Sequence, residues 1–392
     1  MDVRNGHRVV VLGAGYAGMA AAVQLAARLR KRDGVRVSVV NGSEVFTERM
    51  RLHQAGTGWA PAGHRIPDAL AGTGAEFVRA RVTAVDAAAR LVRTEAGTAL
   101  SYDTLVYALG SVTDTTEVPG AADHAFALDG PAEAALLAAR LDALAEGTVV
   151  VAGTGLTGIE TAAEIAERHP RLGVVLLGRQ EPGAGMHPRA RKHLQDALAR
   201  LGVEVRTGEA VKVLPDAVVL ADGTEVPSDA VVWTGGTRVA PLAEAAGFAV
   251  DGRGRIVTDA ALRSVSHPEV YAVGDAAAVR QNYGMMHGTC QSGMPTGVHA
   301  ALSIVRSLGG RAPEPFRFGY FHIPVSLGRA DAVVQFTRPD GTPRSAFLTG
   351  RAAVRYKETV IASPWPTFLR MRRMPASGAF WTRGGRATRG VR

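Results

Sequence analysis

Two glycine-rich segments of this chain have the residue types and the spacing that bind a diphosphate. The segments Gly13-Ala-Gly15-Tyr-Ala-Gly18 and Gly153-Thr-Gly155-Leu-Thr-Gly158 share the pattern G-x-G-x-x-G. The first glycine permits a tight turn, the second lets a pyrophosphate approach the backbone, and the third lets a helix pack on a strand. The sequence therefore predicts two dinucleotide-binding turns. Their contact residues are Gly13, Gly15, Tyr16, Ala17 and Gly18 in the first, and Gly153, Gly155, Leu156, Thr157 and Gly158 in the second.

Three further short segments have residues suited to a nucleotide. Gly274-Asp275 follows a buried apolar run, and an aspartate there accepts hydrogen bonds from polyol hydroxyls such as a flavin ribityl chain. Ala108 to Gly110 and Gly235-Gly236 end two other apolar strands with small residues, which let the backbone lie close to a ligand. The predicted helix Gly293–Ser307 would direct its positive end toward a flavin ring.

Both glycine-rich turns need a strand before them and a helix after them, and the sequence supplies these elements. Short β-branched runs predict buried parallel strands, and alanine-rich stretches predict helices. The resulting pattern is two βαβ units. Their elements are strand 9–12, helix 20–32 and strand 35–40, then strand 148–152, helix 159–168 and strand 173–177.

The residue that follows the second strand of each βαβ unit indicates whether that unit binds a ribose with a free diol or one with a 2′-phosphate. Asn41 stands where a carboxylate usually grips a ribose diol, and its amide makes weaker, uncharged hydrogen bonds. Arg179 follows the corresponding strand of the second unit and suits a 2′-phosphate, which favours NADPH. Glu181 lies close by and keeps NADH open. Arg49 and Arg51 are candidates to neutralise a pyrophosphate, or are surface charges.

We predict an α/β fold with two Rossmann-like domains and a small C-terminal α+β region. The first nucleotide domain is discontinuous, at residues 1–115 and 250–315, and the second nucleotide domain is inserted at 116–249. Residues 316–392 form the C-terminal region, with strands before a helix at 348–361. The segments 77–86 and 91–94 alternate as the two strands of a hairpin would.

Composition bounds the class of protein. The chain has 392 residues, a net charge of +9 and a single cysteine, Cys290, so an intrachain disulfide and a multi-cysteine metal site are excluded. We expect no metal. No signal peptide and no apolar run long enough to span a membrane is recognised, so a cytoplasmic protein is expected. Aromatic residues and arginines after Ser363 suit a membrane surface, or a tail that packs or is solvated. No nucleic-acid module is recognised.

With these motifs in place, the chain resembles the two-dinucleotide-binding flavoprotein reductases, and within them the type II NADH dehydrogenase-like branch. The resemblance rests on the two glycine-rich turns, on Val106 to Gly110 and on Val273 to Ala276. It implies FAD on the first domain and NADPH or NADH on the second. It also implies that Val82 meets the adenine through its backbone and that Glu160 is the acidic residue near the reacting centre.

The chain departs from that branch beside the expected quinone pocket. Gln291 matches, but Pro295 and Thr296 stand where the branch has a Gln-Gln pair. Cys290 alone excludes the multi-cysteine mechanisms of the sulfide:quinone and disulfide reductases. Its thiol is either a small buried group or part of the acceptor pocket.

The function that follows is an FAD-dependent oxidoreductase. NAD(P)H would give hydride to flavin N5, and the flavin would pass electrons to a quinone-like or other small organic acceptor. Two alternatives stay open: a tailoring enzyme of a natural-product pathway, and an NAD(P)H-sensing flavoprotein that acts through a partner. The sequence also leaves open a homodimer and a peripheral contact of the basic tail with the inner face of a membrane.

Overall fold

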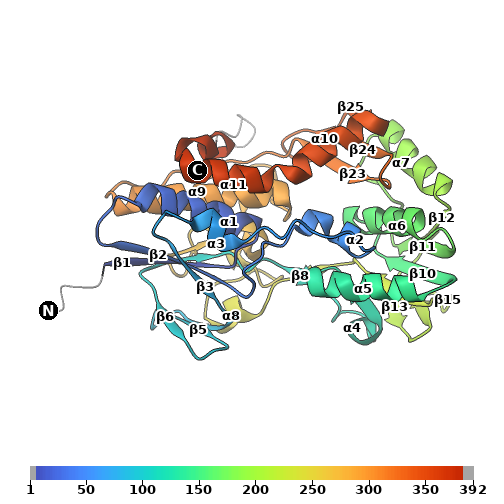
Figure 1. The fold of residues 1–392 in the computed structure, drawn as a ribbon, viewed down its shortest axis with the longest axis horizontal. Helices are drawn as coiled ribbons and strands as arrows, with labels where there is room; N and C mark the ends of the chain where they lie inside the picture. The colour runs from blue at the N-terminus through green and yellow to red at the C-terminus, as the bar shows by residue number, and fades with distance from the viewer. Residues whose placement is uncertain (1–5, 383–392) are drawn as a thin grey trace.

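The computed structural model describes residues 6–382 of the chain, and its first sheet is parallel and five-stranded (Figure 1). The strand order is β19-β7-β1-β2-β3. Its strands are β1 (His7–Leu12), β2 (Val35–Asn41), β3 (Glu76–Arg79), β7 (Thr104–Tyr107) and β19 (Val270–Ala272). All four pairings are parallel. Because β19 comes from the later part of the chain, the predicted return of the chain to the first domain is seen directly in the strand pairing.

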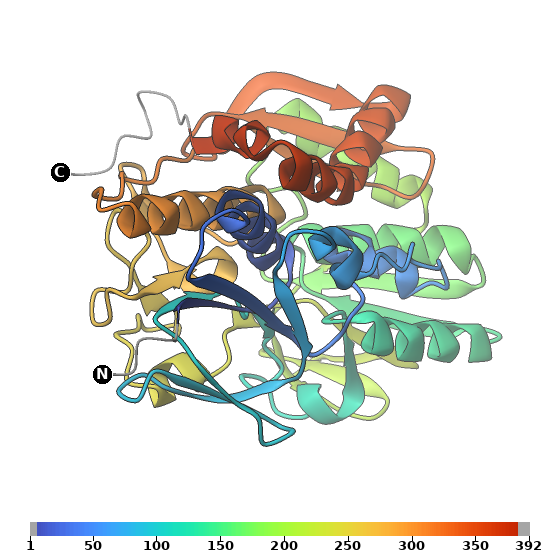
Figure 2. The same ribbon diagram turned by 60° about the vertical axis from the view of Figure 1, so that its left-hand side comes forward.

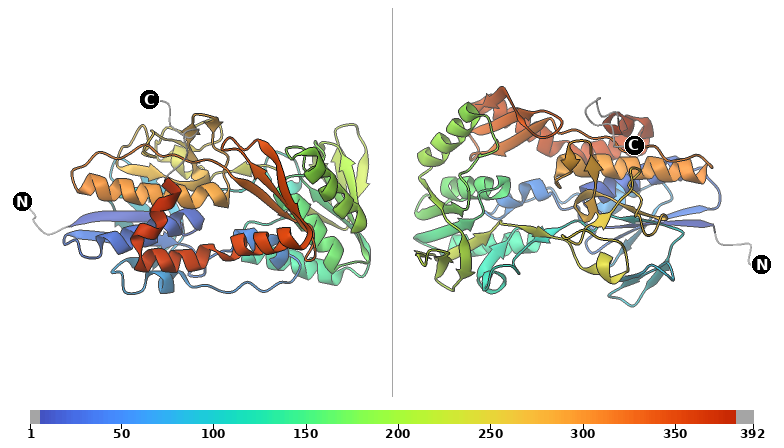
Figure 3. Two further views of the ribbon diagram at one scale, coloured as in Figure 1. Left: turned by 90° about the horizontal axis from the view of Figure 1, so that it is seen from above. Right: turned by 180° about the vertical axis from the view of Figure 1, so that it is seen from behind.

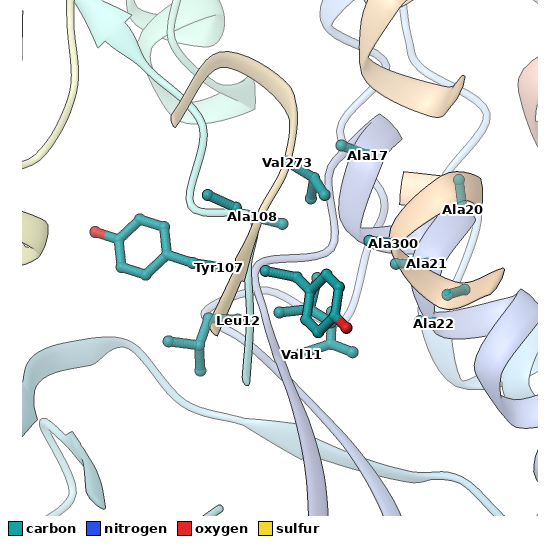
Figure 4. Close-up of a cluster of buried hydrophobic side chains, with 14 of the residues drawn as sticks. Val11, Leu12, Ala17, Ala20, Ala21, Ala22, Tyr107, Ala108, Val273 and Ala300 are labelled. Atoms are coloured by element: carbon teal, nitrogen blue, oxygen red, sulfur yellow. The ribbon is translucent and has the colours of Figure 1, made fainter. Parts of the chain in front are cut away.

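Two helices cover one face of this sheet at close range. They are α1 (Tyr16–Leu29) and α9 (Cys290–Leu308). A Cβ atom added at Gly297 would lie 2.0 Å from the Ala17 carbonyl oxygen, so only glycine lets α9 approach α1 this closely. Figure 4 shows Ala20 and Ala21 beside Ala300, small side chains that fill the contact without holding the helices apart. Helix α9 begins earlier than the predicted Gly293 and continues through Pro295.

A three-stranded antiparallel sheet lies on the other face of the first sheet (Figure 1). It consists of β4 (Val82–Asp86), β5 (Leu91–Thr94) and β6 (Ala99–Ser101). The prediction that 77–86 forms one hairpin strand was wrong. The segment divides at Ala80-Arg81, because β3 pairs in parallel with β2 while β4 pairs antiparallel with β5. Alternating side chains could not distinguish one bent strand from two strands that belong to different sheets.

The second sheet repeats this architecture with strand order β12-β11-β10-β16-β9. Its parallel strands are β9 (Ala125–Ala127), β10 (Gly147–Ala152), β11 (Leu172–Gly178), β12 (Val203–Thr207) and β16 (Ala230–Trp233). Val149 and Val174 pack with three helices on one face, and Val150 and Val175 pack on the other. The helices are α5 (Pro131–Ala143), α6 (Leu156–Arg168) and α7 (Pro188–Arg200). The opposite face carries β13 (Ala210–Val213), β14 (Ala217–Leu220) and β15 (Glu225–Pro227).

Short elements connect the two sheets. A two-stranded antiparallel ribbon joins β8 (Val112–Thr113) to β17 (Thr237–Arg238), where the chain leaves the first sheet and where it returns. The other short elements are η1 (Arg49–Arg51), α2 (Leu52–Ala55), α3 (Ile66–Leu70), α4 (Ala121–His124), α8 (Leu242–Ala245), β18 (Ile256–Val257), η2 (Gly274–Ala276), β20 (Ala277–Ala278), β21 (Arg280–Gln281) and β22 (Gly284–Met285).

The C-terminal region spans both halves of the molecule (Figures 2 and 3). Its antiparallel strands are β23 (His322–Ser326), β24 (Ala332–Thr337) and β25 (Pro343–Thr349), followed by α10 (Gly350–Ala362), α11 (Pro364–Arg373) and η3 (Pro375–Thr382). Val325 and Val333 pack with the helices of the second sheet. Phe368 and Met371 of α11 are fully buried against the first core. The predicted helix at 348–361 is thus confirmed as α10.

The predicted α/β class with two Rossmann-like sheets is confirmed. The predicted domain boundaries at 115, 249 and 315 stay a prediction. Within residues 6–382, no helix combines the length and the apolar character that a membrane crossing requires. Four arginines of the predicted basic tail, Arg383, Arg386, Arg389 and Arg392, lie outside the described residues.

Candidate functional site

One cavity of about 900 Å³ lies where the two sheets and the C-terminal region meet. Its size is at the upper end of the range usual for ligand sites. The first wall comes from the turn before α1 and from the ends of β7 and β19, the second from α6 and the end of β16, and the third from α9, β23 and α10. The cavity therefore brings together segments from the beginning, the middle and the end of the described chain.

The first wall is built on the turn between β1 and α1. Gly13 has a φ of +87°, a conformation that favours glycine, and a Cβ there would lie 2.4 Å from the Ala108 carbonyl oxygen. Gly15 has no atom within 4 Å of its Cβ position, so that side of the turn is open to a ligand. A Cβ at Gly18 would lie 1.9 Å from the Gly13 carbonyl oxygen, so strand and helix touch there. The packing at Gly13 and Gly18 is that of a tight strand-turn-helix connection, and the approach of a pyrophosphate at Gly15 stays a prediction.

Two polar residues of this wall form hydrogen bonds within the protein: Asn41 with backbone groups and Asp275 with a hydroxyl. The Asn41 side chain accepts a hydrogen bond from the Ala14 N–H at 3.0 Å and donates to the Ser43 carbonyl at 2.7 Å. Asn41 lines the cavity, but both ends of its amide serve the turn. Asp275 lines the cavity as well, and its carboxylate accepts from the Ser111 hydroxyl at 2.8 Å. Among the described residues, no hydrogen bond is made to its second oxygen, Oδ1.

Arg49 also lies on the first wall. Its guanidinium donates to the Ser111 carbonyl at 3.1 Å and contacts Asp129 at 3.5 Å. It therefore lies at the junction of the two sheets, beside the same Ser111 that supports Asp275. Arg51, the alternative candidate, points elsewhere: it forms an ion pair with Glu358 at 2.9 Å and its guanidinium lies 5.1 Å from the Trp59 ring centre.

The second wall begins at the start of α6. Leu156, Thr157 and Glu160 line the cavity, and the first two are exposed. Gly153 has a φ of +125°, and a Cβ at Gly158 would lie 1.7 Å from its carbonyl oxygen, which repeats the packing seen at Gly18. Gly153, Gly155 and Gly235 are not part of the cavity lining, although Thr234 and Gly236 beside Gly235 are.

A buried charged cluster joins the second and third walls. Glu160 contacts the Lys357 ammonium directly, and its Oε1 accepts from the Ser326 backbone N–H at 3.0 Å and from the Ser326 hydroxyl at 3.2 Å. Nδ1 of His53 lies 3.7 Å from the other carboxylate oxygen, and its Nε2 is buried without a hydrogen-bond partner among the described residues. We call Glu160, Lys357, Ser326 and His53 the Glu160 cluster.

Burial governs protonation in the Glu160 cluster. Desolvation lowers the pKa of Lys357 to about 7, with Glu358 raising it and Arg51 lowering it. Desolvation also lowers the pKa of His53 well below its ordinary value, and the cations Lys357, Arg329 and Arg51 act in the same direction. His53 is therefore neutral at physiological pH, while Lys357 is able to exchange a proton near neutrality.

The third wall is mostly aromatic. It includes Phe318, Tyr320, Phe321, His322 and Tyr356, with His287 stacked on Tyr320 at a ring-centre distance of 4.0 Å. Cys290 also lines this wall and packs against the first core, so its two interpretations both stay open. Burial raises the pKa of its thiol to about 11, so the thiol stays protonated and is a poor nucleophile.

Two further predicted nucleotide contacts, Val82 and Arg179, are not part of the cavity lining. Val82 begins β4 and pairs with Thr94. Arg179 follows β11, and its guanidinium contacts Glu209 at 3.7 Å while 78% of the side chain is exposed. Glu181, the alternative ribose ligand, accepts from the Gln195 side chain at 3.1 Å. In the described part of the chain, no group of three or more His, Cys, Asp or Glu side chains is arranged to hold a metal ion.

Sequence reasoning identified Glu160 but missed its partners. His53, Ser326 and Lys357 come from three distant segments, and no local motif connects them. The only available signal was a lysine on the predicted helix 348–361, where it sits among exposed charged residues and looks like an ordinary surface group.

Comparison with known proteins agrees with this architecture. The family described as "Pyridine nucleotide-disulphide oxidoreductase" matches residues 7–302. An NADH dehydrogenase-like protein of Mycobacterium tuberculosis is 36% identical over 380 residues, which cover 90% of this chain and 92% of that protein. A type II NADH:quinone oxidoreductase of Staphylococcus epidermidis is 29% identical over 379 residues, with 87% and 92% covered.

Solved structures with little sequence identity share the fold. NDH2 from Plasmodium falciparum in complex with NADH superposes with a TM-score of 0.78 at 13% identity, covering 95% of this chain and 98% of that one. The sulfide:quinone oxidoreductase of Aquifex aeolicus gives a TM-score of 0.76 at 18% identity, with 95% and 92% covered. At this level of identity the likeness concerns the fold.

Proposed function

The chain belongs to the pyridine nucleotide-disulphide oxidoreductase family, and from this premise we propose how its cavity works. It is an FAD-dependent oxidoreductase that takes reducing equivalents from NAD(P)H and passes them to a quinone-like small organic acceptor. The balanced reaction is NAD(P)H + H⁺ + quinone → NAD(P)⁺ + hydroquinone. The protein must therefore bind two nucleotides and an acceptor close together and supply protons to the acceptor.

The observation that carries this proposal is that two nucleotide-binding turns open on one cavity. Gly13 to Ala17 of the first turn and Leu156 and Thr157 of the second line the same space of about 900 Å³. The aromatic third wall closes that space and leaves room for a flat ring. Proximity of two bound reactants removes much of the entropic cost of bringing them together, so a shared cavity is what a relay requires.

The first wall fits FAD. The open side of Gly15 and the helix start at Tyr16 accept a pyrophosphate, and the free oxygen of Asp275 accepts a ribityl hydroxyl. The start of α9 also faces the cavity, and Thr289 and Ser292 cap it reciprocally. The positive end of that helix favours negative charge on a bound ring. When bound, FAD supplies the two-electron chemistry between nicotinamide and acceptor.

The second turn would hold the nicotinamide nucleotide. Its pyrophosphate would lie over Gly153 to Gly158, and Arg179 would lie at the adenosine end. Glu160 stands just after the first turn of α6, on the side of the cavity where the nicotinamide would enter. The exposure of Leu156 and Thr157 supports a ligand that arrives and leaves.

We assign Lys357 as the proton donor to the acceptor. Its ammonium lies on the cavity, only 5% of the residue is exposed, and burial brings its pKa to about 7. Glu160 holds the ammonium in place, and Ser326 fixes the carboxylate through its backbone N–H and its hydroxyl. A proton that Lys357 loses is replaced from solvent through the polar groups of the Glu160 cluster. The neutral His53 beside Glu160 offers a further site for a hydrogen bond.

The acceptor class follows from the third wall. Aromatic side chains offer flat apolar surface, and the lysine supplies a proton to a carbonyl oxygen, which together suit a quinone-like ring. Relatives such as the type II NADH:quinone oxidoreductase of Staphylococcus epidermidis support the same acceptor.

A peripheral membrane contact is part of the proposal. Arg370, Arg372 and Arg373 lie in the last turn of α11, and Met374 beside them is 57% exposed. Basic residues next to an exposed apolar side chain favour an anionic lipid surface. Sedimentation with anionic and neutral vesicles tests this contact.

The central test is spectroscopic. We expect the purified protein to carry the yellow absorbance of oxidised flavin and to lose it on anaerobic addition of NADPH or NADH. Addition of menadione should then restore the colour. A protein that takes up no flavin, or whose flavin neither nicotinamide bleaches, would contradict the proposal.

A further inference from the structure

The proposed function, on which this inference rests, leaves open which residue orients the acceptor. We propose that His322 is that positioning residue, and that its Nε2–H donates a hydrogen bond to a carbonyl oxygen of the acceptor. The acceptor would then be a carbonyl-bearing ring, held by His322 while Lys357 provides the proton.

The position of His322 suits this role. It is the first residue of β23, it lines the third wall of the cavity, and it is only 5% exposed. The Phe321 ring lies 4.1 Å away between centres, and Tyr356 packs edge-on at 5.4 Å. Lys357 follows Tyr356 on α10 and lines the same wall. A hydrogen-bond donor and a proton donor therefore share one aromatic pocket.

Tyr356 determines which nitrogen of His322 carries the proton. Nδ1 of the imidazole lies 2.8 Å from the Tyr356 hydroxyl. A phenol donates to a neutral imidazole nitrogen more readily than it accepts from one, so Nδ1 is the acceptor and Nε2 carries the hydrogen. Burial lowers the pKa of His322 to about 4 and raises that of Tyr356, so both groups keep this state at physiological pH. No described residue accepts a hydrogen bond from Nε2.

Gln291 holds this arrangement in place instead of binding the acceptor. Its Nε2 donates to the His322 carbonyl at 2.9 Å, and its Oε1 accepts from the Phe321 N–H at 3.0 Å. Both polar atoms of the amide are thus committed to the backbone on either side of the His322 Cα. Thr296 is committed too, since its hydroxyl accepts from the Gly274 N–H and donates to the Gly293 carbonyl. The family resemblance places Gln291 in the helix beside the expected quinone pocket, and here its amide fixes the backbone at His322.

The separate roles of His322 and Lys357 are consistent with a balanced reaction. Two electrons and one proton leave NAD(P)H together as hydride equivalents, and the second proton comes from solvent through Lys357. His322 keeps its own proton throughout and strengthens its hydrogen bond as the acceptor oxygen gains negative charge. A preorganised neutral donor of this kind stabilises the transition state more than the bound acceptor.

The test compares acceptors in His322→Phe, which keeps an aromatic ring but has no donor. We expect unchanged flavin content and an unchanged rate of flavin reduction by NAD(P)H. The value of kcat/KM for menadione should fall about tenfold or more, since removal of one such donor has effects of this order or larger. Ferricyanide accepts single electrons without a carbonyl hydrogen bond, and its reduction should stay within about twofold of wild type, a change too small to signal a lost donor.

Three further variants make the test specific. His322→Gln, which restores an N–H donor, should recover part of the menadione rate. Tyr356→Phe removes the hydroxyl that fixes the tautomer of His322. It should lower kcat/KM for menadione by less than His322→Phe does, and it should leave ferricyanide reduction unchanged. His187→Phe changes a histidine that stacks on Phe347 outside the cavity, and should change neither acceptor. Binding of a redox-inert quinone analogue, measured by calorimetry, should weaken in His322→Phe.

The outcomes separate this inference from the proposed function. Menadione kcat/KM within twofold of wild type in His322→Phe would overturn it, as would equal losses with both acceptors, which indicate a structural role. A wild-type protein that reduces ferricyanide but no quinone would also overturn it. If the wild-type flavin is absent or is not reduced by either nicotinamide, the proposed function itself fails.

Discussion

The two glycine-rich turns have the same sequence pattern and the same internal packing, yet their surroundings differ. In the first turn and the helix behind it, nearly every residue of α1 is buried. In the second, Gly155, Leu156 and Thr157 are all exposed, and Leu156 keeps 41% of its surface. Gly15 itself is exposed like Gly155, so the two sites differ in the helix start that follows: Tyr16 and Ala17 are buried, whereas Leu156 and Thr157 are exposed.

The difference arises from what lies over each turn. Helix α9 packs against α1 through Gly297, and α11 adds Phe368 and Met371 to the same core. The start of α6 has no such cover: Ser326 of β23 meets α6 at Glu160, after the exposed Leu156 and Thr157. The motif accounts for the shape of the turn, while distant segments decide how much of the helix start after it is covered. This fits a resident FAD at the first turn and an exchanging NAD(P)H at the second.

The largest effect should come from adding a side chain at equivalent glycines of the two turns. Gly18→Val puts atoms where the Gly13 carbonyl already lies, and the covered core cannot yield. We expect a loss of about 3 kcal/mol or more of stability and a protein without flavin, measured by denaturant unfolding and absorbance. Gly158→Val clashes with the Gly153 carbonyl in the same way and should also lose stability, but it should keep its flavin and show a raised KM for NAD(P)H. Equal flavin loss in both variants would break the comparison.

A second prediction tests the Glu160 cluster, which joins the open turn to the acceptor wall. Lys357→Met should lower quinone turnover about a hundredfold, the usual order for a lost acid, with flavin content unchanged. Protonated Lys357 is the active form, so wild-type turnover should fall as pH rises through about 7, the value to which burial lowers its pKa. This alkaline decline should disappear in Lys357→Met. Glu160, His53, Arg51 and Glu358 surround the ammonium, and a decline that persists in the variant would point to another group.

A third prediction concerns the open end of the second turn. A Cβ at Gly178 would lie 2.7 Å from the Thr154 hydroxyl oxygen, so no carboxylate fits at the end of β11, and Arg179 is the charge that a ribose phosphate would meet. Arg179→Ala should lower kcat/KM for NADPH about tenfold, a modest effect because the side chain is exposed, and leave NADH unchanged. The matched control is Arg206→Ala, since Arg206 pairs with Glu204 on the neighbouring strand. Equal losses with both nucleotides would argue against a 2′-phosphate site.

The smallest effect should come from a pair of aspartates in equivalent places. Asp103 accepts from the Arg8 N–H at 2.8 Å, and Asp229 accepts from the Thr148 N–H at 2.8 Å. Only Asp103 also pairs with a guanidinium, that of Arg8. Asp103→Asn should therefore cost about 1 kcal/mol more stability than Asp229→Asn at neutral pH.

The difference in stability between these two variants should depend on pH, and the pKa of Asp103 gives the direction of that dependence. The Arg8 guanidinium lowers the pKa of Asp103 from 3.8 to about 2. A lowered carboxyl pKa stabilises the fold above the ordinary value, and this contribution is lost as pH falls from 3.8 toward 2. Thermal unfolding at several pH values should show the two asparagine variants converging in acid. A constant gap would mean that the ion pair contributes nothing.

Much of this fold follows from local pattern. Apolar runs before the glycine-rich turns and helices after them are short-range signals, so β1, α1, β10 and α6 were predictable. The placement of Gly274-Asp275 at a strand end was predictable for the same reason. The boundary between β3 and β4 was not, because side-chain alternation does not report which neighbour a strand pairs with.

Only those residues of the site that belong to a sequence motif were predictable. Glu160 entered through the second turn and the family resemblance. Lys357 and His322 became visible only when α10 and β23 packed against α6, since their chemistry depends on burial and on partners far away in sequence. Gln291 shows the opposite case: the residue matched the family pattern, and the structure uses its amide for the backbone.

The strand order of the first sheet has a consequence for synthesis on the ribosome. Strands β9 to β16 of the second sheet lie in one continuous stretch of chain, so that unit has all its strands soon after residue 233 emerges. The first sheet starts at His7 but waits for β19 and for α9, which ends at Leu308. During translation the first sheet therefore has an incomplete apolar face. The second sheet starts later in the chain but has all its strands before the first sheet does.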